Sequence, residues 1–159
     1  MVQPTFLYGC VSWVLTERRK AQVRTLQRKM LRMIVGTGRR AELDTEGGEV
    51  LESWVAWVRR ATAKAEYIKV QYNVPDWIDE VALRRFRWAG HVMRRSDGRW
   101  SQTFMEWSLV GGRRVGRPTT RWLDDIVKFF PAGGIPWQIL AKNWQAWADM
   151  EAAFVAFAR

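Results

Sequence analysis

The sequence has very little cysteine and histidine, and this scarcity excludes several classes of site. Of 159 residues, one is a cysteine, Cys10, and one is a histidine, His91. A single cysteine cannot form an internal disulfide, and no zinc centre built on several cysteines or on two histidines is possible within this chain. Because Leu7, Val11 and Trp13 surround Cys10, we interpret it as a small buried residue.

Long hydrophobic runs are also missing. No apolar stretch approaches the length of about 20 residues that crosses a bilayer. The N-terminus lacks the charged-then-apolar order of a signal peptide. We therefore expect no membrane insertion and an intracellular, reducing environment.

Arginine and tryptophan are abundant. The chain has 26 Lys and Arg against 16 Asp and Glu, a formal charge of +10, and 11 tryptophans. Its pI is about 10.6. This excess of positive charge favours an acidic partner, with RNA or DNA first, whereas the alternative is a basic subunit of a larger protein assembly. With 48% hydrophobic residues the chain is expected to fold, and its length suits one domain or two very small ones.

Helical periodicity predicts a mostly α fold, a small bundle of about five helices with short aromatic-rich connections. Thr16 is the expected N-cap of a helix over 17–35. Residues 1–16 are compatible with either a short strand or a buried turn. The remaining elements follow as a loop over 36–48, a helix over 49–72, a helix over 77–95 capped by Asp76, a helical or extended piece over 100–107, a helix over 120–130 capped by Thr119, and a helical region over 136–158. We expect segments 1–45, 46–110 and 111–159 to form one continuous domain.

Arginines gather on one face of two predicted helices. Arg24, Arg28 and Arg32 form a stripe at i, i+4 and i+8, which suits either a solvated face or phosphate contact. A helical wheel of the helix over 77–95 separates an apolar face from a basic one. The basic face contains Arg84, Arg87, His91, Arg94 and Arg95.

Arg85 does not obey this division, because it falls within the apolar face. It must extend its charge to solvent, pair with a carboxylate or meet a ligand there.

The loop over 111–118, GGRRVGRP, combines glycines with Arg113, Arg114 and Arg117. Glycine permits close backbone approach to a phosphate, and arginine neutralises its charge. The loop lacks the GK[ST] ending of a Walker motif. It predicts contact with nucleic acid, and a protein-docking loop is the alternative.

Tryptophans at helical spacing are usually core, so we predict that Trp88, Trp107 and Trp122 are buried. Trp100 follows a glycine turn and Arg99, which makes it the best candidate for an exposed stacking surface.

The carboxylate pair Asp124–Asp125 is interpreted as the start of a helix, where acids favour the dipole. Asp125 could pair with Arg121, and Asp124 with Lys128. His91 has no nucleophile or orienting partner evident in the sequence. We therefore expect no enzymatic activity, no cofactor and no metal.

Three motifs carry a family likeness. Leu7-Tyr8-Gly9-Cys10 with Trp13 resembles the LYG-x-E-x-W motif that follows the polymerase core of non-LTR (LINE-type) retrotransposon reverse transcriptases, although Cys10-Val11-Ser12 stands where the glutamate is usual. Residues 86–95, FRWAGHVMRR, resemble the RWxGHxxR motif of the family. Gly116-Arg117-Pro118, Arg121-Trp122 and Asp124-Asp125-Ile126 resemble its GRPxxRWxDDI motif. Order and spacing agree over nearly the whole chain.

The resemblance implies the thumb and post-polymerase region without the catalytic core, with residues 1–45 as a thumb-like segment. It implies a non-catalytic remnant that holds RNA or DNA, in the nucleus if the ancestral role is kept. The alternative is a structural adaptor recruited into a larger assembly. The candidate nucleic-acid contacts are Arg87, His91, Arg94, Arg95, Trp100, Arg113, Arg114, Arg117 and Arg121.

Overall fold

The structure is a computed structural model that describes residues 3–43, 48–97, 100–106, 120–130 and 133–159. It divides into two compact units. The core unit is Met1–Arg19 with Trp77–Arg159, and the hairpin unit is Lys20–Asp76. These boundaries differ from the predicted segments 1–45, 46–110 and 111–159, because the N-terminal stretch packs with the C-terminal part. For example, Phe6 stacks on Trp77 with 4.6 Å between ring centroids.

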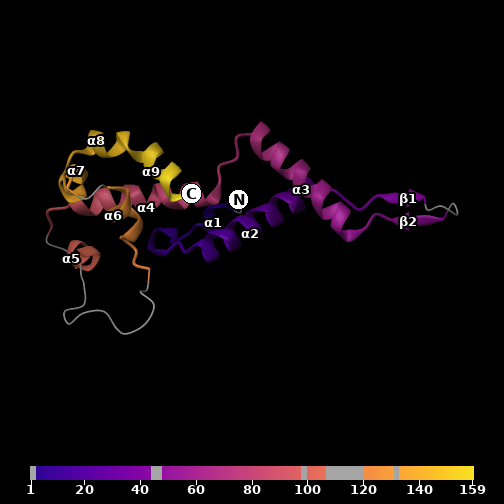
Figure 1. The fold of residues 1–159 in the computed structure, drawn as a ribbon, viewed down its shortest axis with the longest axis horizontal. Helices are drawn as coiled ribbons and strands as arrows, with labels where there is room; N and C mark the ends of the chain where they lie inside the picture. The colour runs from indigo at the N-terminus through magenta and orange to yellow at the C-terminus, as the bar shows by residue number, and fades with distance from the viewer. Residues whose placement is uncertain (1–2, 44–47, 98–99, 107–119, 131–132) are drawn as a thin grey trace. The chain divides into compact units, whose positions relative to one another are not determined.

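The hairpin unit contains most of helix α2 (Glu17–Val35), strands β1 (Ala41–Leu43) and β2 (Glu49–Leu51), and helix α3 (Trp54–Gln71). Figure 1 shows the hairpin continuing from α2 and leading into α3. The bounds of α2 are those predicted, and Thr16 Oγ1 accepts a hydrogen bond from the Arg19 backbone N–H at 3.3 Å. Arg28 and Arg32 of the predicted stripe face α3, through an ion pair with Glu66 at 3.1 Å and a hydrogen bond to Thr62 Oγ1 at 3.1 Å.

The hairpin corrects two predictions, the loop over 36–48 and the helix start at 49. The strands are antiparallel, with Glu42 opposite Val50. Helix α3 begins at Trp54, where Ser53 Oγ accepts a hydrogen bond from the Ala56 backbone N–H at 3.2 Å. Because Ser53 caps the helix, residues 49–53 lie before its first turn, although the sequence pattern had placed them within the helix.

Glu52 links the β-hairpin to α3 through hydrogen bonds. Its carboxylate accepts hydrogen bonds from Arg60 Nε at 3.0 Å and from the backbone N–H of Arg40 at 3.2 Å, while its carbonyl oxygen accepts one from Arg39. The side chain is buried. The hydrogen bond from Arg60 is the main reason that the pKa of the Glu52 carboxyl falls to about 2.

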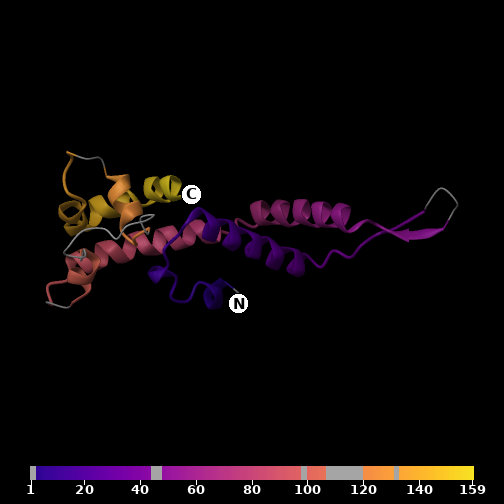
Figure 2. The ribbon, with the colours of Figure 1, turned by 60° about the horizontal axis from the view of Figure 1, so that its bottom comes forward.

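Helix α4 (Trp77–Arg94) is the centre of the core unit. Helices α7 (Trp137–Lys142), α8 (Trp144–Asp149) and α9 (Glu151–Ala158) lie along it (Figures 1 and 2). Phe86 stacks on Trp147, with centroids 4.0 Å apart, and on Phe154 at 4.6 Å. Trp147 Nε1 donates a hydrogen bond to the Phe86 carbonyl at 3.0 Å, so the buried indole also satisfies its polar atom.

Residues 3–16 form short helical turns rather than a strand, and Leu7, Cys10 and Leu15 are their buried side chains. Helix α1 (Gln3–Phe6) and the 3-10 helix η1 (Cys10–Ser12) are joined through Gly9, whose φ of 67° suits glycine. Cys10 is buried as predicted, and its burial raises the pKa of the thiol.

The mostly α prediction is confirmed, but about five helices was too few, because the described ranges alone contain α1 to α9. The predicted final helix is divided at Asn143 and Met150. These breaks change the helical phase of the region, in which Trp144 is 63% exposed and Phe157 49% exposed. Within the described part of the chain, no helix is long and apolar enough to cross a membrane.

Candidate nucleic-acid interface

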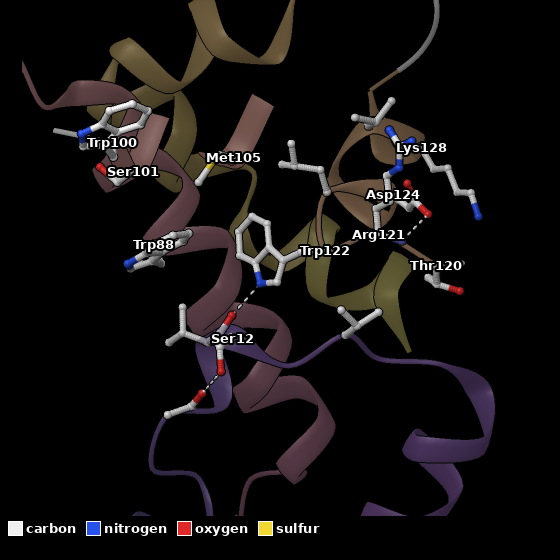
Figure 3. Close-up of a pocket in the computed structure, with 15 residues that line it drawn as sticks. Ser12, Trp88, Trp100, Ser101, Met105, Thr120, Arg121, Trp122, Asp124 and Lys128 are labelled. Carbon is white, nitrogen blue, oxygen red and sulfur yellow. Dashed lines mark hydrogen bonds between the residues drawn. The ribbon is translucent and has the colours of Figure 1, made fainter. Parts of the chain in front are cut away.

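An open hollow of about 1220 Å³ lies in the core unit. Its walls come from three separate stretches: the turn around η1, helices α4 and α5 (Trp100–Glu106), and the segment that leads into α6 (Asp124–Phe129). Each wall contains part of one of the motifs that resemble the reverse transcriptase family, namely Gly9, Trp88 and Arg121 to Asp124. The fold therefore brings the three motifs to one surface (Figure 3).

Trp122 joins the three walls. Its Nε1 donates a hydrogen bond to the Val11 carbonyl at 2.6 Å (Figure 3). Its ring meets the Trp88 ring edge-to-face, with centroids 5.2 Å apart. Both contacts hold the indole in a defined orientation.

Arg85 supports Trp122 from inside the protein. Only 1% of its side chain is exposed, and Nη1 donates to Asp125 Oδ2 at 2.9 Å. Nη2 donates to the Trp122 carbonyl at 2.5 Å, and the guanidinium carbon lies 5.1 Å from the centroid of the Trp122 ring. Of the three alternatives for this apolar-face arginine, pairing with a carboxylate is the one observed.

The Asp124–Asp125 pair lies in the first turn of α6, as predicted, but the helix begins at Asp124 and not at residue 120. Asp124 Oδ2 accepts a hydrogen bond from the backbone N–H of Arg121 at 2.7 Å, and Asp125 binds Arg85. Arg121 therefore meets Asp124 through its backbone, whereas we had considered a side-chain pair with Asp125. Among the described residues, no group of three or more His, Cys, Asp or Glu side chains could hold a metal ion.

Three of the predicted phosphate contacts, on α4 or directly after it, are engaged within the protein. Arg87 forms two hydrogen bonds to the Glu151 carboxylate, at 2.8 and 2.7 Å, which raise its pKa. Arg94 Nη1 donates to the Ala141 carbonyl at 2.7 Å, and Arg95 Nε donates to Asp97 at 3.0 Å. The Arg87 side chain is still 59% exposed, so its outer face remains accessible.

The other predicted contacts fall into two groups. His91, Trp100 and Arg121 are exposed. Trp100 and Arg121 also line the hollow. Arg113, Arg114 and Arg117 lie outside the described residues.

Trp100 is 76% exposed, in agreement with its predicted position on the surface. The prediction that Trp88 is core was wrong, because it is 38% exposed at the margin of the apolar face of α4. Trp122 is half-buried, and Trp107 lies outside the described residues.

Met105 and Ser101 also line the hollow and were not singled out from the sequence, and Lys128, which lines it too, was considered only as a partner of Asp124. A feature of the sequence that indicates this surface is the pair Arg121–Trp122, which places an aromatic side chain beside an exposed cation.

Over 154 residues the chain is 30% identical to an uncharacterized transposon-derived protein of Caenorhabditis elegans. The alignment covers 92% of this chain and 50% of that protein, so the chain spans about half the length of the curated relative it matches. The homology supports a transposon origin. No protein-family model and no solved structure matches the chain.

Proposed function

We propose that this chain is a non-catalytic, nucleic-acid-binding region derived from a retrotransposon reverse transcriptase. Its role is to hold the phosphate backbone of RNA or DNA. The transposon-derived relative supports the origin, and the three motifs that meet at one hollow support the more specific assignment.

The charge balance is the observation that carries the proposal. With 26 cationic and 16 anionic side chains, pairing every carboxylate one-to-one would still leave ten cations. Such a surplus attracts polyanions and releases their counterions on binding.

Phosphate contact is assigned to the exposed cations around the hollow, Arg121 and Lys128, with His91 on the outer face of α4. The loop arginines Arg113, Arg114 and Arg117 remain part of the proposal on sequence grounds. The carboxylates Asp124 and Asp125 support a non-catalytic role, because both have structural partners.

A salt titration tests the proposal. Binding to a fluorescently labelled RNA should weaken with salt along a log–log slope of about −3 or steeper, as expected for several phosphate contacts. Neutralising Arg113, Arg114 and Arg117 to glutamine should make the slope shallower by about 2. The control neutralises the exposed Lys29, Arg59 and Lys64 of the hairpin unit, an equal change in charge.

Binding that is indifferent to salt contradicts the proposal, as does an equal loss of affinity in the test and control variants. The proposal that the chain is non-catalytic has a separate test. A metal-dependent nuclease activity that is lost in Asp124→Ala would overturn it.

One observation favours the second candidate, a structural adaptor in a larger assembly. The hairpin unit exposes several large apolar side chains, among them Met33, Ile34, Trp54 and Val55. Exposed apolar groups of this size are typical of protein contact surfaces. A stoichiometric protein partner that survives nuclease treatment and high salt would favour the adaptor over the nucleic-acid-binding role.

A further inference from the structure

The hollow of the core unit has two kinds of wall. Figure 3 shows Trp88 and Trp100 on one side, the cations Arg121 and Lys128 on the other, and Trp122 between them. The accessible lining is mainly apolar. This arrangement differs from a purely cationic groove, which would serve a phosphate backbone alone.

From these features we infer that the hollow binds unpaired bases of a single-stranded nucleic acid, so that the protein prefers single strands to a duplex of the same sequence. This inference rests on the proposed nucleic-acid-binding function. It adds the form of nucleic acid that the site selects.

Trp100 is the main stacking candidate. Its indole is 76% exposed, whereas the Trp122 indole is already fixed by the Val11 carbonyl and the Trp88 ring. An aromatic face left open to solvent can stack with any base, because every base has a π face. In a duplex the base faces are already stacked, and only base edges are accessible in the grooves.

Charge complementarity identifies the occupant as a polyanion. The side chains of Arg121 and Lys128 border the apolar surface, and the neighbouring carboxylate of Asp124 is bound to the backbone N–H of Arg121. A single strand that stacks a base on Trp100 and continues across the hollow past Trp122 therefore brings its phosphates to these two cations. Stacking in the hollow and cations at its border are what single-strand binding needs.

The size of the hollow also fits. At about 1220 Å³ it exceeds the usual range of small-molecule pockets, roughly 300 to 1,000 Å³. A run of several nucleotides is therefore a better occupant than one small metabolite.

The test compares labelled single-stranded RNA of about twelve nucleotides, within the site sizes usual for such proteins, with the corresponding RNA duplex. Wild-type protein should bind the single strand at least about tenfold more tightly. Trp100→Ala should weaken single-strand binding by about tenfold, the loss expected when one stacked base is given up. Duplex binding should change by less than about twofold.

Trp144→Ala is the matched control. Trp144 is 63% exposed in the same unit, on α8, and does not line the hollow. It should leave both affinities unchanged. Circular dichroism of both variants checks that each is folded.

Four results would overturn the inference. Salt-dependent binding with no preference for single strands, or with no effect of Trp100→Ala, rejects the stacking site and leaves the proposed function standing. A protein partner lost only in Trp100→Ala, with RNA binding intact, assigns the hollow to protein. Absence of salt-dependent binding to any nucleic acid rejects the proposed function and the inference together.

Discussion

Arg85 and Asp125 form an ion pair at 2.9 Å across 40 positions of the chain, with the arginine almost entirely buried. The pair links α4 to the first turn of α6, and the same arginine contacts Trp122 at the hollow. A buried charge without its counter-charge is strongly destabilising. This pair therefore sets both the position of α6 and the orientation of an indole in the candidate site.

Removing one partner of this pair should cost more than removing both. We expect Asp125→Asn to lower the free energy of unfolding by about 3 kcal/mol, because Arg85 stays buried without a carboxylate. Arg85→Met combined with Asp125→Asn should recover most of that loss. Urea denaturation measures each term of the double-mutant cycle.

Asp97→Asn is the control for that cycle, because the Arg95–Asp97 pair is more exposed. It should cost less than about 1 kcal/mol. If the losses of unfolding free energy in the two single variants simply add in the double variant, Arg85 and Asp125 have no coupling energy, which would contradict the role assigned to the pair.

Gly90→Ala should destabilise the core unit. A Cβ at Gly90 would lie 2.5 Å from Trp147 Nε1 and 2.6 Å from Cδ1 of the same indole, which is buried and hydrogen-bonded. Overpacking of this kind costs about 1 to 3 kcal/mol, which thermal unfolding will detect. Gly38→Ala is the control, because a Cβ there meets nothing within 4 Å. Equal melting temperatures for the two variants would show that Gly90 is not a packing requirement.

The contribution of Glu52 should depend on pH. Its pKa is about 2 in the folded protein and 4.5 ordinarily, so the carboxylate stabilises the folded state above about pH 5. That contribution declines as pH falls from about 5 and is lost as pH passes through about 2. The deficit of Glu52→Gln relative to wild type should therefore be full at pH 7 and shrink on acidification.

The Trp57 indole N–H gives a local measure of this effect, because it donates to the Thr37 carbonyl at 2.7 Å within the same unit. Its hydrogen exchange should be faster in Glu52→Gln than in wild type at pH 7, with the ratio approaching one as acid protonates Glu52. A ratio that stays constant down to about pH 2 would contradict the role assigned to the carboxylate.

Glu151→Gln should strengthen nucleic-acid binding. The carboxylate holds Arg87 through two hydrogen bonds, and its removal frees an exposed guanidinium for phosphate. We expect the salt slope for single-stranded RNA to steepen by about 0.7, the value for one added contact. Glu66→Gln makes the same change in net charge but frees Arg28 in the hairpin unit. If both variants bind RNA equally, net charge accounts for the effect and Arg87 makes no special contact.

Local signals explain what was predictable. The helix Glu17–Val35 and the helix from Trp77 follow from spacing and terminal residues that act within a few positions. The exposure of Trp100 was predicted in the same way, from the local sequence that precedes it. By contrast, the pairing of β1 with β2 and the contacts of Glu52 with Arg40 and Arg60 join residues that a helical wheel does not bring together.

The candidate site was predictable only in its composition. Arg87, Arg94 and Arg95 form a basic face on the wheel, but Glu151, Ala141 and Asp97 engage them in the folded protein. Two of those partners lie about fifty or more positions away along the chain. Sequence patterns place a side chain on a face of its helix and leave open what packs against that face.

The amino-acid sequence by itself determined the surplus of positive charge, the mostly helical character and the absence of sites that need several cysteines or histidines. These properties are sums over residues or short-range preferences, so no fold is needed to evaluate them. Tertiary structure decided the rest, because it depends on contacts between distant segments. Those contacts assemble Gly9, Trp88, Trp100 and Trp122 around one hollow and give the buried Arg85 its carboxylate.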